Sequence, residues 1–220
     1  MDRDKLYKVT AYVTRGAGAS KEVLVFRHPS AGVQLPAGTV EKGEAPDTAV
    51  IREVTEETGL ADVSLVRELA VEMIAVPEGQ GAVLDPVPLL RAPHSGADRL
   101  PTLLGRSGPW VDVGEVRGDY CCVTEHIDTL DAEAPRIVDT RSGWVPCSAL
   151  AQQVERRHYE VRTNSATPEC WTHFAEGEHN FELYWAPVGG ETGLVASNAA
   201  WLRLVREKLM GPALEGTTID

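Results

Sequence analysis

The chain has 220 residues, 43% of them hydrophobic, and a formal net charge of −12 at pH 7. This length and composition fit one globular domain with a decorated core. Broad binding to nucleic-acid backbones requires a basic surface, so the acidic balance argues against that function. No secretory signal is recognisable near the N-terminus, and no apolar run reaches the length of a membrane span. We therefore expect a cytoplasmic protein that does not contact membranes.

The first elements expected along the chain are two strands. Residues 6–14 alternate between apolar and polar, and residues 22–27 follow after a glycine-containing turn. The apolar run at 23–26 is typical of a central strand that is buried on both faces. Arg27 ends this strand and points toward the next loop, where it either contacts a phosphate or lies on the surface.

A helix is expected directly after that loop, over residues 46–58. Pro46 suits the first helical position, and Asp47 favours the positive end of the helix dipole. Gly59 fits a left-handed cap at the C-terminal end. Ala45 is a poor N-cap, so we expect Glu44 to assist at the N-terminal end.

Three carboxylates share one face of this helix, because Glu53, Glu56 and Glu57 are spaced i, i+3 and i+4. Like charges at this spacing repel unless a cation or solvent separates them. A cluster of oxygen ligands suits a hard cation, Mg²⁺ or Mn²⁺, and the Gly38 carbonyl could add another ligand. Arg52 lies one turn before Glu56 and can pair with it. The alternative is a solvated acidic helix without a metal.

The spacing of these residues resembles a known motif. Gly38, five residues, Glu44, seven residues and then the run from Arg52 to Leu60 resemble the Nudix box of the Nudix hydrolase superfamily, with nine positions matched. The resemblance implies an α+β fold, an α/β/α sandwich with a mixed β-sheet. It also implies metal-dependent hydrolysis of a nucleoside diphosphate linked to another group, such as ADP-ribose, or of a nucleoside triphosphate.

The resemblance also implies roles for single residues. Glu53, Glu56 and Glu57 would bind the metal together with the Gly38 carbonyl, while Arg52 and Glu44 would orient the site. Two rivals stay open: an isomerase or synthase-coupled branch of the fold, and a sensing module that binds a nucleotide without cleaving it. Sensing modules tend to lose the box carboxylates and to gain a DNA-binding domain. Here the carboxylates are present and no basic helix-turn-helix is visible.

The segment after the helix is harder to interpret. A strand is expected over 63–75, and residues 77–109 then contain six prolines, which predicts a long irregular connection. A hairpin is expected from 110–116 and 120–125, around an Arg-Gly-Asp triplet that we interpret as a turn rather than an adhesion signal. We expect residues 77–142 to be an insertion into a single domain that spans residues 1–212.

The core then resumes. A strand end is expected at 143–146 and a short helix at 148–156. Further strands are expected at 159–162, 170–175 and 180–186. Ser197 or Asn198 should cap a final helix that ends at Met210, because Gly211 and Pro212 follow. Residues 213–220 are expected to form a flexible tail.

Several residues outside the box are candidates for catalysis or substrate binding. The general base is either a box glutamate or a glutamate on a distant loop, for which Glu176 and then Glu178 are the candidates. Aromatic residues that could stack on a base are Tyr12, Trp171, Tyr184 and Trp185. Pro77 follows Leu60 by 17 residues, an offset that weakly resembles ADP-ribose-hydrolysing members.

Four cysteines are present, Cys121, Cys122, Cys147 and Cys170. None forms a Cys-x-x-Cys pair, and adjacent cysteines are poorly suited to a disulfide. We therefore expect four reduced thiols and no zinc site. The sequence leaves a monomer and a homodimer open.

Overall fold

A computed structural model describes residues 5–105, 110–128, 137–175 and 179–211. The chain forms two compact units. The box unit comprises Val9–Val71 and Arg157–Asp220, and the second unit comprises Met1–Lys8 and Glu72–Arg156. Three long strands contribute residues to both units: β1 (Lys5–Arg15), β5 (Val63–Ala75) and β13 (Gln153–Thr163).

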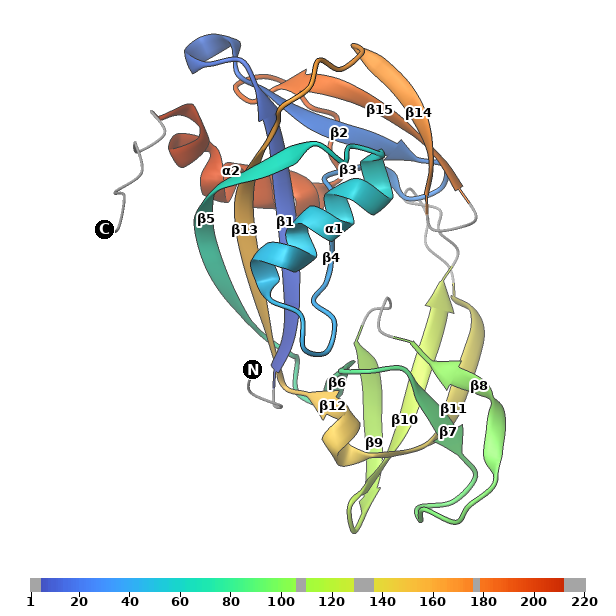
Figure 1. The fold of residues 1–220 in the computed structure, drawn as a ribbon. Helices are drawn as coiled ribbons and strands as arrows, with labels where there is room; N and C mark the ends of the chain where they lie inside the picture. The colour runs from blue at the N-terminus through green and yellow to red at the C-terminus, as the bar shows by residue number, and fades with distance from the viewer. Residues whose placement is uncertain (1–4, 106–109, 129–136, 176–178, 212–220) are drawn as a thin grey trace. The chain divides into compact units, whose positions relative to one another are not determined.

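One sheet is built on the strand order β14-β15-β2-β1-β13-β5, with β3 beside β2 and β4 beside β1. Helix α1 crosses one face of this sheet and α2 lies behind it (Figure 1). The strands β1 and β2 are antiparallel, whereas an isolated bridge between Val33 and Leu194 is parallel, so both directions of pairing occur. The expected α+β fold with a mixed sheet is confirmed. The box unit also contains η1 (Gly18–Ser20), β2 (Glu22–His28), β3 (Gly32–Gln34), β4 (Ala37–Thr39), α1 (Pro46–Thr58), β14 (Cys170–Ala175), β15 (His179–Pro187) and α2 (Ala196–Met210).

The central strand of the box unit is β2, as its sequence predicts. Its run from Val23 to Phe26 is at most 1% exposed, so both faces of the strand are covered. Val23 and Val25 belong to a core cluster with Leu202, Val205 and Leu209 of α2. Burial of each such aliphatic side chain contributes about 1.5–3 kcal/mol.

A buried ion cluster joins β5, β13 and the residue before β2 to the end of α2. The Glu160 carboxylate is completely buried and accepts hydrogen bonds from Lys21 at 2.7 Å and from Arg67 at 2.9 Å. The Lys21 ammonium also donates to the carbonyl of Leu209 at 2.6 Å, and the Arg67 guanidinium donates to the carbonyl of Lys208 at 2.6 Å. Cations at the C-terminal carbonyls of a helix also interact favourably with its dipole. The cluster therefore fixes the end of α2 on the sheet.

The second unit contains a seven-stranded sheet with the order β12-β6-β9-β10-β11-β7-β8. The antiparallel hairpin that the sequence predicts is present, because Tyr120 pairs with Arg117 at the β9–β10 turn. The core cluster of this sheet is mainly aliphatic and includes Leu89, Leu104 and Val123. The elements are β6 (Gln80–Val83), β7 (Val87–Leu90), β8 (Arg99–Leu104), β9 (Val111–Arg117), β10 (Tyr120–Asp128), β11 (Ile137–Pro146), η2 (Cys147–Ala149) and β12 (Leu150–Ala151).

The expectation of an irregular connection over 77–109 is wrong, because β6, β7 and β8 lie in this segment. Proline lacks the backbone N–H that a central strand needs, but it is tolerated at sheet edges and bulges. Pro101 lies on β8, which ends the strand order, and Pro88 lies next to a register shift between β7 and β8. Prolines therefore mark here an edge strand and a register shift, rather than a segment without strands.

The helix expected at 148–156 is also wrong. A single 3-10 turn at Cys147–Ala149 is followed by β12 and then by β13. Leu150 pairs with Val83 and Ala151 with Ala82, and most of β13 is buried. Pairing with distant strands overrides the weak local preference for helix in this segment.

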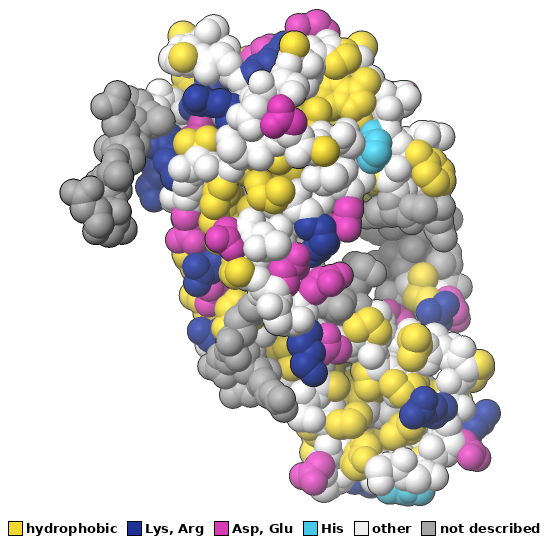
Figure 2. All heavy atoms as spheres, viewed as in Figure 1, with side chains coloured by type: hydrophobic (Ala, Val, Ile, Leu, Met, Phe, Trp, Pro, Cys, Tyr) yellow, Lys and Arg dark blue, Asp and Glu magenta, His cyan; other side chains and the backbone are white. Residues whose placement is uncertain are grey.

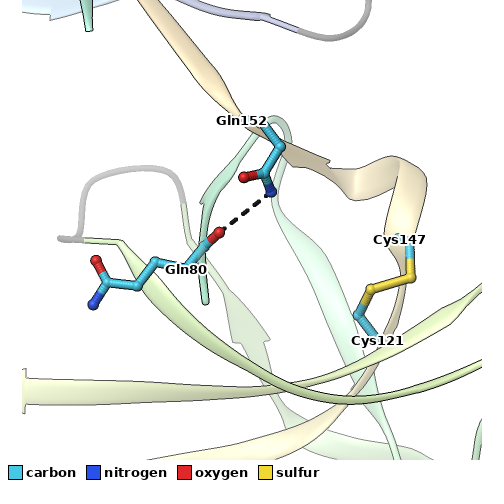
Figure 3. The surroundings of a disulfide bond; sticks show 4 residues. All are labelled: Gln80, Cys121, Cys147 and Gln152. Atoms are coloured by element: carbon cyan, nitrogen blue, oxygen red, sulfur yellow. Dashed lines mark hydrogen bonds between the residues drawn. A yellow bond between two sulfur atoms is a disulfide. The ribbon is translucent and has the colours of Figure 1, made fainter. Parts of the chain in front are cut away.

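The structure also corrects the expectation of four reduced thiols. Cys121 and Cys147 form a disulfide with an S–S distance of 2.04 Å, while Cys122 and Cys170 are free (Figure 3). Cys121 pairs across β10 and β11 with Val145, which brings Cys147 within reach of it. Near the disulfide, the Gln152 amide donates to the carbonyl of Gln80 at 3.2 Å (Figure 3). The prediction failed because it weighed only cysteines that are close in sequence.

The N-terminal end of α2 differs from the expectation too. The helix begins at Ala196, and its N-cap is Val195, without a side-chain hydrogen bond. Asn198 lies inside the helix, where it is 6% exposed.

Neither of the α-helices in the described ranges combines the length and apolar character that crossing a membrane requires.

Candidate active site

The expected box helix is present as α1, which spans Pro46–Thr58. Pro46 begins the helix after Ala45, which makes no side-chain capping bond. Gly59 has a φ of +76°, and its N–H donates to the carbonyl of Thr55 at 3.0 Å. The helix is therefore delimited by the proline and the left-handed glycine that the sequence predicts.

Arg52 lies at the centre of the carboxylates. Its guanidinium donates to both oxygens of Glu44 at 3.0 Å, and its Nη1 donates to Glu53 and to Glu56 at 2.9 Å each. Its Nη2 also donates to the carbonyl of Thr39 at 3.0 Å. The planar guanidinium suits such a fork of contacts, and lysine could not reproduce it. Arg52 therefore links the loop before α1 to two carboxylates of the helix.

The carboxylates around Arg52 differ in environment. The Arg52 hydrogen bond lowers the pKa of Glu44, and Glu44 in turn raises the pKa of Arg52. Burial raises the pKa of Glu53 despite the neighbouring guanidinium, and its side chain is 12% exposed. The Glu56 side chain is 56% exposed. A carboxylate that is poorly solvated, like Glu53, gains most from an additional positive charge.

Gly38 leaves space for Glu53. A Cβ atom built on Gly38 would lie 1.9 Å from Oε1 of Glu53, so a side chain at position 38 would displace this carboxylate. Next to it, the N–H of Ala37 donates to Oε2 of Glu57 at 2.9 Å, and Glu57 is 7% exposed. The loop and two helix carboxylates are thus fitted to each other.

The donor set consists of carboxylates and a backbone carbonyl, which is the chemistry that a hard divalent cation prefers. In the structure, Glu53 and Glu56 are hydrogen-bonded to Arg52, and Glu57 to Ala37. Among the described residues, no group of three or more His, Cys, Asp or Glu side chains is arranged to hold a metal ion. The residues nevertheless fit such a cation in chemistry, because oxygen atoms are the ligands that it prefers. On the face drawn in Figure 2, acidic side chains gather around basic ones over α1 and the loop before it.

Two side chains of β14 bind the C-terminal end of α1. The indole N–H of Trp171 donates to the carbonyl of Thr58, and Nε2 of His173 bonds to the carbonyl of Glu56, both at 3.0 Å. We call Trp171 and His173 the helix clamp. The sequence marks Trp171 as a candidate for stacking, and it does not assign His173 a contact with the helix. The available signal is that both residues carry an N–H donor and share one face of a strand.

The loop before Gly38 is also held by a side chain that sequence reasoning missed. Oδ1 of Asn198 accepts a hydrogen bond from the N–H of Leu35 at 2.8 Å. Two residues upstream, the carbonyl of Val33 accepts from the N–H of Val195 at 3.0 Å. The start of α2 thus holds the segment that leads into the box.

The remaining candidates have other partners in the structure or lie outside the described residues. The Arg27 side chain is 57% exposed, and its Nε lies 3.7 Å from Oε2 of Glu182. Tyr12 is completely buried, which makes it a core residue, and Trp185 packs against Arg15 at 4.5 Å. The Tyr184 hydroxyl donates to the carbonyl of Thr192 at 3.4 Å. The two loop glutamates, Glu176 and Glu178, lie outside the described residues.

A family model identifies the family of this chain. A search of curated proteins finds no match. Among solved structures, a UDP-X diphosphatase is similar with 12% sequence identity and a TM-score of 0.44. That alignment covers 93% of this chain, which spans 64% of the length of the diphosphatase chain. The family model of the NUDIX domain matches residues 5–165, which is more than half of the sequence. The chain therefore belongs to the NUDIX domain family.

Proposed function

We propose that the chain is a divalent-metal-dependent Nudix pyrophosphohydrolase. Its substrate would be a nucleoside diphosphate linked to another group, such as a nucleotide sugar, or a nucleoside triphosphate. The observation that carries the proposal is the arrangement around Arg52, which is bonded to Glu44, Glu53 and Glu56 in a segment matched by the family model. Several carboxylates gathered around one guanidinium are more typical of a functional site than of a purely structural helix.

Each box residue has a role in this proposal. Glu53, Glu56, Glu57 and the carbonyl of Gly38 would hold Mg²⁺ or Mn²⁺. When bound, the cation would neutralise charge on the diphosphate and make the attacking water more acidic. Arg52 and Glu44 would orient the carboxylates through the bonds that they already make. Arg27 is the candidate for a contact with a substrate phosphate.

The proposed reaction is the hydrolysis of one P–O–P linkage by one water molecule. The oxygen of a water molecule bonds to one phosphorus of the P–O–P linkage, and the bridging oxygen leaves with the other phosphate. A general base takes the proton of the attacking water. The base would be one of the box glutamates, or else Glu176 or Glu178. The products are a nucleoside monophosphate and a phosphorylated second half, or pyrophosphate from a triphosphate.

A substrate screen tests the proposal. Nucleoside diphosphate sugars and nucleoside triphosphates are incubated with the protein and Mg²⁺ or Mn²⁺ in ¹⁸O-labelled water, and the products are weighed by mass spectrometry. We expect at least one compound to be cleaved at its phosphoanhydride, with one ¹⁸O in one product. Tight binding of a nucleotide without cleavage of any compound would contradict the proposal and favour the sensing module.

A further inference from the structure

Two carbonyls in the C-terminal turn of α1 accept hydrogen bonds from another part of the box unit. The last four carbonyls of a helix have no partner within it. Here the carbonyl of Thr55 accepts from Gly59, whereas those of Glu56 and Thr58 accept from the helix clamp. Because a carbonyl oxygen only accepts, Nε2 of His173 carries the proton in this bond. Two side chains of β14 therefore take the place of solvent at the end of this helix.

Gly59 is fitted to His173 as well as to the helix cap. Its φ of +76° is a conformation that side chains disfavour. Independently, a Cβ atom on Gly59 would lie 2.8 Å from Nδ1 of His173, which is closer than packed atoms approach. The glycine that caps α1 thus also admits the imidazole ring against the last turn.

The clamp acts on the turn that carries two of the three carboxylates. His173 bonds to the backbone of Glu56 itself, and Glu57 is the next residue. The side chain of Glu57 accepts a hydrogen bond from the N–H of Ala37 at 2.9 Å. A helix turns by about 100° per residue, so fraying of this turn would carry both carboxylates away from Glu53.

We propose that His173 and Trp171 are positioning residues that hold Glu56 and Glu57 in register with Glu53 for cation binding. The inference rests on the proposed function and goes beyond the box, because both residues lie outside the matched range of 5–165. Neither side chain needs to touch substrate. Their N–H groups set the backbone of the last turn, and the backbone sets the carboxylates.

Variants that differ only in the N–H donor test the inference. His173→Ala and Trp171→Phe each lose the donor, whereas His173→Gln keeps an N–H group at similar reach. Thr172→Ala and Phe174→Ala are matched controls, because these exposed residues alternate with the clamp on the same strand. Mn²⁺ affinity is measured by electron paramagnetic resonance, and kcat and KM are measured on the substrate found in the screen. Amide hydrogen exchange over residues 53–60 reports the last turn without any metal.

We expect His173→Ala and Trp171→Phe to weaken Mn²⁺ binding about tenfold, the lower end for outer-shell partners of metal ligands. They should lower kcat with KM little changed and speed amide exchange over 53–60. His173→Gln should restore most of the affinity, and the two controls should match the wild type. Mn²⁺ affinity and exchange within twofold of the wild type in both donor-loss variants would overturn the inference. So would equal losses in His173→Ala and His173→Gln. If His173→Ala does not fold, Trp171→Phe and His173→Gln decide.

The two proposals can fail separately. A wild-type chain that binds Mn²⁺ but cleaves no compound contradicts the hydrolase, and the Mn²⁺ affinities of the variants still decide the role of the clamp. A wild-type chain that cleaves its substrate with unchanged rates in the donor-loss variants keeps the hydrolase and overturns the clamp.

Discussion

Each unit adds a different kind of bond to its apolar core. The box unit buries the Glu160 carboxylate with Lys21 and Arg67, and it holds Glu57 at 7% exposure beside the box loop. The core cluster of the second unit is mainly aliphatic, and Cys121 of this cluster is bonded to Cys147. Buried charges must be paired wherever they occur, whereas aliphatic cores tolerate many sequences. The comparison teaches that the proposed cation site shares its unit with a buried ion cluster, whereas the second unit is cross-linked by a disulfide.

The largest difference between the units should appear when a glutamate is neutralised. Glu57→Gln should lower turnover about 100-fold or more, because a proposed metal ligand is lost while the amide can still accept from Ala37. Glu115→Gln in the second unit is the matched control, because Glu115 is exposed and bonded only to Arg117 among the contacts described. Steady-state kinetics and circular dichroism of both variants check this. A folded Glu57→Gln protein with the wild-type rate would show that the acidic face of α1 is only solvated surface.

The ion cluster of the box unit should be sensitive to the loss of its carboxylate. Glu160→Gln should destabilise the protein by about 3–5 kcal/mol, because the buried Lys21 ammonium and the Arg67 guanidinium would both lose the carboxylate that they bind. Urea unfolding measures the free energy. Glu182→Gln is the control, since its exposed pair with Arg27 should contribute less than about 1 kcal/mol. Equal effects of the two changes would remove the contrast between buried and exposed charge.

The second unit should respond to reduction, and the box unit should not. Reduction of Cys121–Cys147, which closes a separation of 26 residues, should destabilise the second unit by about 3 kcal/mol. Hydrogen exchange with and without reductant should show faster exchange in β10 and β11 and unchanged exchange in α1. Thiol titration of the unfolded, unreduced protein should find two free thiols. Four free thiols would mean that the disulfide does not form.

The smallest effect is expected at the loop that precedes the box. Asn198→Ala removes the acceptor of the buried Leu35 N–H and should cost about 1–2 kcal/mol. Leu204→Ala on the same helix is the control, because Leu204 is 54% exposed. Thermal unfolding and kcat are the measurements. An Asn198→Ala protein as stable and as active as the Leu204→Ala protein would exclude a role of α2 in holding the loop.

The sequence predicts the box unit well, because local signals agree there with the final structure. Pro46, Gly59 and the spacing of Arg52 to Glu56 define α1 and its ion pair from short-range rules alone. The run from Val23 to Phe26 predicts a strand buried on both faces, and β2 is one.

What could not be predicted depends on contacts between residues far apart in the chain. Leu150–Ala151 is a strand because it pairs with β6, and residues 153–156 belong to β13, which lies between β1 and β5 in the sheet. Cys147 reaches Cys121 through the β10–β11 register. His173 and Asn198 bind backbone atoms, and such contacts leave no pattern in the side chains that they serve. Short-range rules therefore identify the carboxylates but miss the residues that hold them.

Metal dependence tests the central claim most directly. Protein treated with EDTA and then dialysed is assayed on the substrate from the screen while Mg²⁺ or Mn²⁺ is added back stepwise, with Glu53→Gln as the paired variant. The account predicts no turnover without metal, recovery as the cation saturates its site, and a higher metal requirement in the variant. Full turnover by the metal-free protein would contradict the assignment of Gly38, Glu53, Glu56 and Glu57 as a cation site.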